Sequence, residues 1–152
     1  MPAGVGFHPF FPKPGTARLE AVAHRLWKGS AEEFPSRSAA IPPELDFERS
    51  RPVRDACGID HCYSGWNRHA AIEWPDARYR IALHADGRLD HFVLYVPQDR
   101  DFFCIEPVSH AINAFNFPGS NEHVALALAP GQERSATLTL HCERSTRTSV
   151  TP

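Results

Sequence analysis

The chain has 152 residues, of which 42% are hydrophobic and 22% charged, a composition that indicates one globular domain and excludes an intrinsically disordered chain. Its formal net charge of -2, with both signs mixed along the chain, excludes a nucleic-acid or acidic-membrane partner that is held by bulk charge. No apolar run has the length of a membrane span, and the N-terminus lacks a basic-then-apolar signal pattern, so we expect a cytoplasmic location.

The four cysteines are scattered without a C-x-x-C pair, which predicts reduced thiols. His61-Cys62 and His141-Cys142 place a histidine beside a cysteine, but structural zinc sites have tighter paired spacing. We therefore predict no zinc site at these two His-Cys neighbours.

Residues 1–14 contain too much proline and glycine for a helix and predict an ordered loop. The phenylalanines of this loop need burial, so we expect it to lie against the core with His8 in its midst. Pro9 restricts the backbone of His8 to extended conformations. Taken by itself, His8 is either a packing histidine in an aromatic turn or a functional imidazole.

Residues 16–27 alternate in a way that favours a strand over a short helix. Residues 29–52 are polar and broken by prolines, and a loop of this length usually covers something or carries function. The apolar side chains within it predict that it packs across a sheet.

Residues 55–67 combine acid, imidazole and aromatic side chains. Asp60 and His61 lie shortly before Tyr63 and Trp66. Carboxylates accept hydrogen bonds from hydroxyl groups, and flat rings stack on the apolar faces of sugars, so this group suits a neutral polyhydroxylated ligand. The alternative is a turn in which Asp60 caps local amides.

The clearest strand signals follow. Short strands are predicted for five segments: residues 70–74, 78–85, 91–96, 124–128 and 135–142. The Asp86-Gly87 pair between two of them predicts a hairpin. Residues 113–122 are predicted to form a loop.

Residues 101–110 read DFFCIEPVSH, an apolar run that predicts a strand buried on both faces. Glu106 within this run must be paired, protonated or functional, because an isolated buried carboxylate is very costly. It is either satisfied by backbone amides or an arginine, or it marks a functional site. Short strands linked by turns, without a long helix, predict an all-β antiparallel sandwich or barrel.

Four sequence blocks carry a family resemblance: GFHPFF at 6–11, IDHCYSGW at 59–66, VLYVPQDRDFFCIEPVSHAINAFN at 93–116 and LAPGQERSATL at 128–138. In this order they resemble the aldose 1-epimerase (mutarotase) family. The resemblance implies a galactose mutarotase-like β-sandwich over residues 1–142, and residues 143–152 are predicted to be a frayed tail. It also implies a reaction that interconverts the α and β anomers of an aldohexose by acid/base ring opening and closure, without a metal or organic cofactor.

The resemblance implies roles for particular residues. Glu106 matches the general base, His8 the general acid, and Asp60 the carboxylate that holds sugar hydroxyls. Trp66 is expected to be a stacking surface, and His61 is a further candidate for substrate binding.

Members of this family are about twice as long as this chain, and the matching region is their C-terminal half. The missing N-terminal strands predict exposed sheet edges and apolar surface, self-association through those edges, and weak activity of the chain alone. The expected partner is a small sugar, an aldohexose or a phosphosugar. Two alternatives are a non-catalytic carbohydrate-binding sandwich and a chain that forms half of a larger assembly.

Overall fold

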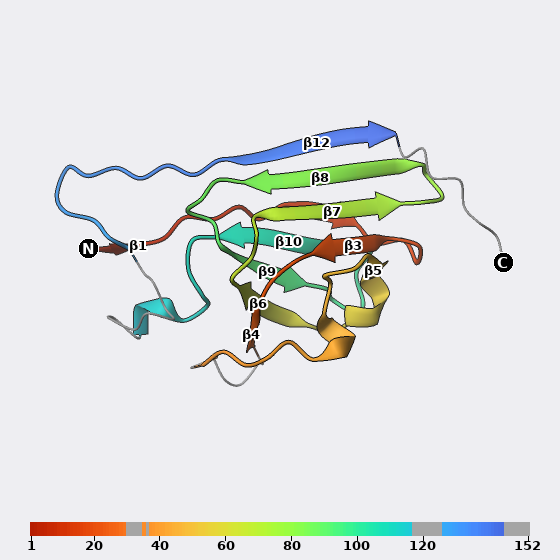
Figure 1. Ribbon diagram of the computed structural model, residues 1–152, viewed down its shortest axis with the longest axis horizontal. Helices are drawn as coiled ribbons and strands as arrows, with labels where there is room; N and C mark the ends of the chain where they lie inside the picture. The colour runs from red at the N-terminus through yellow and green to blue at the C-terminus, as the bar shows by residue number, and fades with distance from the viewer. Residues whose placement is uncertain (30–34, 36, 117–125, 145–152) are drawn as a thin grey trace.

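The computed structural model describes residues 1–29, 35, 37–116 and 126–144 (Figure 1). These residues form two five-stranded antiparallel sheets and one two-stranded sheet, with three short 3-10 helices. The predicted all-β antiparallel sandwich is confirmed. No helix among the described residues has the length and apolar character needed to cross a membrane.

The first sheet has the strand order β2 (Phe10–Pro12), β10 (Phe102–Val108), β9 (His91–Tyr95), β6 (Asp60–Ser64) and β4 (Arg25–Lys28). The second sheet has the order β12 (Leu138–Arg144), β8 (Tyr79–Ala85), β7 (His69–Trp74), β3 (Arg18–Ala21) and β5 (Arg51–Pro52). The small sheet pairs β1 (Pro2–Ala3) with β11 (Leu126–Ala127). The 3-10 helices are η1 (Pro43–Leu45), η2 (Val53–Ala56) and η3 (Ala114–Asn116).

The core lies between the facing sides of the two large sheets. Fully buried side chains come from both, for example Leu94 and Ile105 from the first sheet and Ile72 and Leu83 from the second. Burial of each such side chain stabilises the fold by about 1.5–3 kcal/mol. Successive residues of a strand point to opposite faces, so the inward position of Ile105 turns its neighbours on β10 to the outer face of the first sheet.

Most predicted strands agree with the structure, and β7, β8 and β9 match three of them to within a residue at each end. Residues 16–27, predicted as one strand, form the two strands β3 and β4, which belong to different sheets. The predicted loop at 29–52 packs on the core as expected: Phe47 is buried, and the Tyr63 hydroxyl donates a hydrogen bond to the Leu45 carbonyl oxygen at 3.0 Å. Residues 30–34 and 36 of that loop lie outside the described residues.

The predicted hairpin at Asp86-Gly87 is wrong. Strands β8 and β9, which flank it, lie in different sheets, so the turn carries the chain from one sheet to the other. Both edges of β8 are already paired, with β7 and β12, and both edges of β9 with β6 and β10. The Asp86 carboxylate stabilises this crossing turn by accepting hydrogen bonds from the backbone N–H groups of Arg88 and Thr137, each at 3.0 Å.

The C-terminal third departs from the predicted boundaries in three places. Strand β12 continues to Arg144, two residues into the predicted tail, and residues 145–152 lie outside the described residues. The predicted strand at 124–128 contributes β11, while its residues 124 and 125 are not described. The predicted loop at 113–122 begins with η3, and its residues 117–122 are likewise outside the description.

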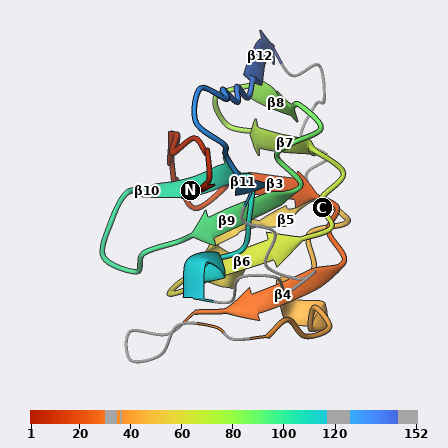
Figure 2. The same cartoon turned by 90° about the vertical axis from the view of Figure 1, so that its left-hand side faces the viewer.

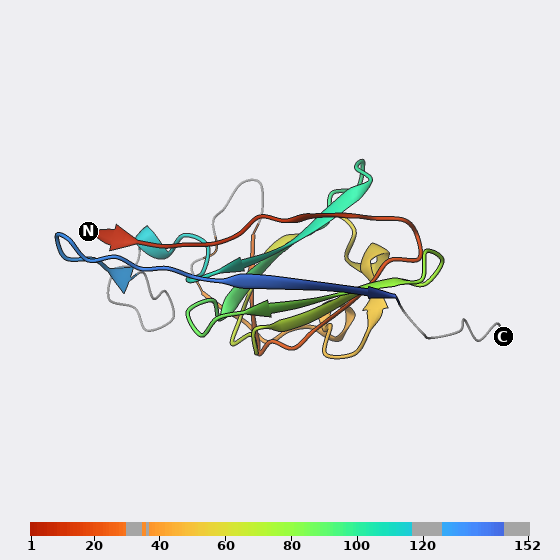
Figure 3. The ribbon, with the colours of Figure 1, turned by 90° about the horizontal axis from the view of Figure 1, so that it is seen from above.

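Strand β2 is an edge strand of the first large sheet and β12 an edge strand of the second, and the second sheet extends past the first at β12, which forms an overhang. Strand β12 is the last strand of the second sheet and lies at the top of Figure 2, beyond the cover of the first sheet. Seen from above in Figure 3, β12 and the N-terminal segment that leads into β2 lie nearest the viewer. On the inward-facing side of this overhang, Leu140 of β12 is 47% exposed and Tyr79 of β8 is 44% exposed. The expectation of exposed sheet edges and apolar surface therefore agrees with the structure.

Candidate functional site

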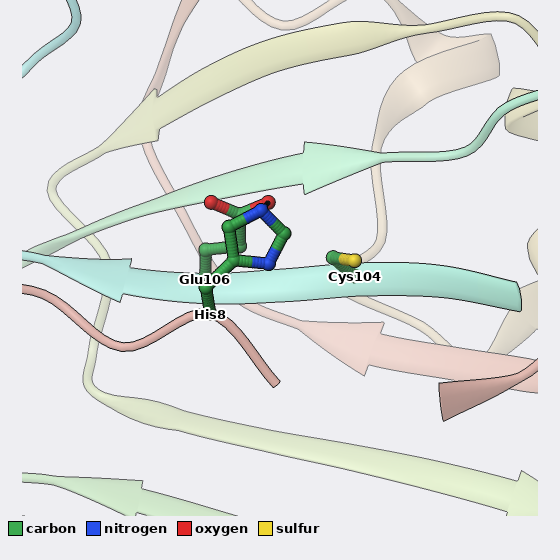
Figure 4. Close-up of side chains that lie close together, drawn as sticks. All are labelled: His8, Cys104 and Glu106. Carbon is green, nitrogen blue, oxygen red and sulfur yellow. Dashed lines mark ion pairs between the residues drawn. The ribbon is translucent and has the colours of Figure 1, made fainter. Parts of the chain in front are cut away.

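Strand β10 and the segment before β2 bring Glu106 and His8 together. Gly6 forms a β-bridge with Val108, and Phe10 pairs with Cys104, so this antiparallel register places His8 opposite Glu106. The approach is close at Gly6, where an added Cβ would lie 2.7 Å from the Val108 side chain. Figure 4 shows the result: the His8 ring meets the Glu106 carboxylate above β10, with 3.3 Å between Nε2 and Oε1.

The pair has one sheltered member and one open member. The Glu106 side chain is 14% exposed and the His8 side chain 56%. Burial raises the pKa of the Glu106 carboxyl, the charge of His8 opposes this by lowering it, and the charge of Asp60 raises it further. The carboxylate that the sequence required to be paired therefore faces an imidazole, and its proton affinity is increased.

His8 is held from its other side by Phe10. The two rings are stacked, with centroids 4.7 Å apart and planes inclined by 9°. Because Phe10 belongs to β2, this contact ties the imidazole to the edge of the first sheet.

Asp60 lies on the same outer face, across two strands. It pairs with Tyr95 of β9, which in turn pairs with Cys104 of β10, so the three residues form a row across the sheet. Asp60 is exposed and starts β6, so the alternative in which it lies in a turn does not hold. Its charge raises the pKa of both Glu106 and Cys104, which places its carboxylate within electrostatic reach of the pair.

The structure does not bring His61 or Trp66 to this site. His61 follows Asp60 directly and so points to the opposite face of β6, where its Nδ1 is buried without a hydrogen-bond partner among the described residues. Trp66 is 1% exposed in the core, where its Nε1–H donates a hydrogen bond to the His69 carbonyl oxygen at 2.8 Å. A fully buried indole cannot stack on a ligand, so the prediction for Trp66 is corrected.

Sequence reasoning missed three aromatic residues and a thiol on this face. Phe10 was expected to be buried with the other phenylalanines of its loop, but it is 59% exposed. Its ring centroid lies 4.9 Å from that of Phe102, and the Tyr95 ring centroid lies 6.3 Å from that of Phe102. The signal was available, because positions 102, 104 and 106 of one strand must share a face.

Cys104 is the missed thiol. It is fully buried, and burial, followed by the charges of Glu106 and Asp60, raises its pKa to about 12. At neutral pH the thiol therefore keeps its proton, which makes it a poor nucleophile by itself. His8, Cys104 and Glu106 nevertheless offer three metal-ligating atoms within 4.8 Å of one another.

A second hydrophobic cluster closes the far part of this outer face. Trp27, Cys62 and Val93 pack there against Ala111 from the segment that follows β10. The open part of the face is therefore the end near β2, where His8, Glu106 and Phe10 lie.

Comparison with known proteins identifies the family. The family model for aldose 1-epimerase matches residues 1–141. A relative from Escherichia coli strain K12, the uncharacterised protein YphB, is 30% identical over 154 residues, which cover 94% of this chain and 51% of the relative. The chain belongs to the aldose 1-epimerase family. It spans about half the length of the curated relative that it matches.

Solved structures agree with this assignment. The crystal structure of a candidate aldose 1-epimerase from Escherichia coli K12 superposes with a TM-score of 0.83 at 30% identity, and the alignment covers 95% of this chain and 51% of that one. A galactose mutarotase-like protein from Clostridium acetobutylicum gives a TM-score of 0.78 at 22% identity, covering 95% of this chain and 48% of that one, and shows the shared fold. The galactose mutarotase-like sandwich expected from the sequence is thus confirmed.

Proposed function

We propose that this chain carries the acid/base pair of an aldose 1-epimerase, which interconverts the α and β anomers of an aldohexose. Glu106 is the general base, His8 the general acid, and Asp60 accepts hydrogen bonds from sugar hydroxyls. One observation carries the proposal: a sheltered carboxylate with a raised pKa faces a more exposed imidazole at 3.3 Å on an open sheet face of this family's fold.

Ring opening and ring closure each need two proton transfers, and the whole cycle leaves no net change in protonation. The Glu106 carboxylate takes the proton of the C1 hydroxyl while the His8 imidazolium gives a proton to the ring oxygen, and the bond between C1 and the ring oxygen breaks. The aldehyde then rotates about the C1–C2 bond. On closure the ring-oxygen proton returns to His8 and the Glu106 proton returns to the new C1 hydroxyl, which regenerates both side chains. A sugar must enter between the two groups, and the exposed His8 ring is the member that can rotate to admit it.

The surrounding face suits a sugar. Phe10 and Phe102 present aromatic surface beside the pair, and this surface takes the stacking role that the sequence assigned to Trp66. The exposed Asp60 carboxylate supplies hydrogen-bond acceptors on the other side. Apolar rings combined with a few polar groups are typical of sites for small polyhydroxylated ligands.

The chain alone is proposed to bind sugar weakly and to turn it over slowly. It spans about half the length of its relatives, and the pair lies near the edge at β2 where the first sheet ends. The alternative, that the chain is half of a larger assembly, is favoured by the exposed Leu140 and Tyr79 on the inner side of the overhanging strands. A cytoplasmic location stays a prediction.

Exchange spectroscopy of α- and β-galactose, glucose and their 6-phosphates by NMR tests the proposal. The rate with the chain added is compared with the buffer rate and with E106Q, which keeps the shape of the side chain and removes the base. A Glu106-dependent excess rate on any of these sugars supports the proposed function. Equal rates for wild type and E106Q would refute it, and full activity of the isolated chain would refute the proposed weak binding and slow turnover of the chain alone.

A further inference from the structure

We propose that His8, Cys104 and Glu106 together bind a zinc ion, and that the bound ion blocks the proposed sugar site. The binding stands on the geometry of the three side chains alone. Blocking of the sugar site rests on the proposed function, so zinc binding and blocking need separate measurements.

The three side chains converge because two adjacent segments carry them. Cys104 and Glu106 are two residues apart on β10 and therefore share its outer face, and the register places His8 across from Glu106. Their ligand atoms all lie within 4.8 Å of one another, and the imidazole Nε2 and carboxylate Oε1 are 3.3 Å apart. Among the residues that the structure describes, no other three His, Cys, Asp or Glu side chains bring ligand atoms this close.

These distances lie close to those of a zinc site. Zinc bonds of about 2.0–2.3 Å in tetrahedral geometry separate neighbouring ligand atoms by about 3.3–3.8 Å. The His8–Glu106 separation already agrees with this value. The ligand atoms lie up to 4.8 Å apart, so the distance from the Cys104 sulfur to its partners must shorten by roughly 1 Å. Rotation of the exposed His8 ring and of the Glu106 side chain toward the sulfur supplies this movement.

The donor set also selects the metal. One imidazole nitrogen, one thiolate and one carboxylate oxygen are the mixed ligands that zinc accepts, whereas magnesium and calcium prefer oxygen ligands alone. The carboxylate of Asp60 adds negative charge near the group. The buried thiol must lose its proton on binding, and the charge of the metal offsets that cost.

A zinc ion bound here excludes the proposed reaction. The His8 nitrogen and the Glu106 oxygen that hold the metal are the same atoms that would transfer protons to and from the sugar. Zinc and sugar are therefore expected to compete, and zinc released from the site would restore activity.

Cobalt titration tests the binding directly. Co²⁺ bound to a thiolate gives a sulfur-to-metal charge-transfer band in the near ultraviolet, and Zn²⁺ added afterwards displaces it. The titration uses the full chain in an H69A background, because the His69 and His84 Nδ1 atoms lie 3.2 Å apart on the exposed face of the second sheet and could bind metal by themselves. The expected result is one thiolate-bound cobalt per chain.

Substitution of the thiol identifies the ligand. C104S should abolish the charge-transfer band and weaken zinc binding at least about 10-fold, since even the loss of a group behind a metal ligand costs 10- to 100-fold. C142S, which alters an exposed cysteine on β12, is the matched control and should keep the band. No band in the starting chain, or a band that persists in C104S and disappears in C142S, would overturn the zinc site. Circular dichroism of each variant checks that the sheet is retained.

Sugar exchange with and without zinc tests whether zinc blocks the sugar site. The Glu106-dependent exchange measured in EDTA should be lost at saturating zinc, and C104S should need at least about 10-fold more zinc for the same loss. Exchange that continues at saturating zinc overturns the proposal that zinc blocks the sugar site. Absence of exchange even in EDTA counts against the proposed function and against blocking of a sugar site by zinc. The cobalt band still decides whether zinc binds.

Discussion

Replacing Trp66 with phenylalanine separates a core role from a ligand-stacking role. The Trp66 indole is 1% exposed, its N–H donates to the His69 carbonyl oxygen at 2.8 Å, and its ring lies edge-on to Phe92 with centroids 5.4 Å apart. Phenylalanine keeps an aromatic ring at this position but removes the N–H donor and part of the ring volume. The substitution should therefore lower the free energy of unfolding and leave sugar binding unchanged.

The size of the effect follows from these contacts. Loss of the hydrogen bond costs about 1 kcal/mol, and loss of roughly three buried ring atoms costs about 2 kcal/mol. A total of about 3 kcal/mol corresponds to a decrease in Tm of about 6–12 °C for a domain of this size. Thermal unfolding followed by circular dichroism measures this decrease.

Phe10 provides the matched comparison. It is 59% exposed, so F10A should reduce stability by no more than about 1 kcal/mol, a minor part of the value of a fully buried phenylalanine. Because Phe10 stacks on His8 at 4.7 Å, the same substitution should weaken the chemical-shift changes that galactose or glucose causes in an NMR titration. If W66F instead weakened sugar binding at an unchanged Tm, the assignment of Trp66 to the core would be wrong.

Three further predictions concern charge and surface. In EDTA, E106Q should raise the Tm at neutral pH, because burial raises the pKa of the Glu106 carboxyl and so penalises its charged form. This gain should disappear as the pH falls below the unfolded pKa of about 4.3, since both side chains are then neutral, and a less stable E106Q at neutral pH would contradict the argument. D60N should lower the pH midpoint of the Glu106 carboxyl carbon in an NMR titration, because the charge of Asp60 raises that pKa, and an unchanged midpoint would show that this charge does not reach Glu106. L140E should reduce self-association measured by light scattering, because Leu140 is 47% exposed on an apolar face, and a wild-type chain that stays monomeric at high concentration would argue against that interface.

The strands could be predicted where one face of the strand is apolar and the other polar. Strand β8 shows this alternation, and its predicted bounds agree with the structure to within a residue. The Asp86-Gly87 pair failed as a hairpin signal because turn chemistry is local, whereas strand pairing depends on which sheet edges are already occupied. Strands β8 and β9 each have both edges paired to other strands, and no short segment of sequence contains that information.

The candidate site was predicted in part for a similar reason. The family resemblance identified His8 and Glu106, and they meet in the structure because their two segments pair in antiparallel register. His61 was misplaced because both faces of β6 are apolar: Tyr63 lies in the core, and Cys62, on the other face, is covered by the segment after β10. Alternation then does not reveal which face is outward, and an error of one residue moves a side chain to the opposite side of the sheet.

The geometry of the proposed acid/base pair is separable in this chain from the proposed binding of a sugar. His8 and Glu106 meet through two segments that are paired with each other, so their 3.3 Å contact needs no residue from outside the chain. We expect fewer groups to hold a sugar here, because the chain spans about half the length of the curated relative that it matches and the pair lies near an unpaired sheet edge at β2. Interactions that bind ground state and transition state equally affect KM, whereas proton transfer affects kcat. We therefore expect the isolated chain to have a raised KM and a kcat that still depends on Glu106, measured by sugar exchange over a range of concentrations. A kcat equal in wild type and E106Q would show that the contact between His8 and Glu106 has only a structural role.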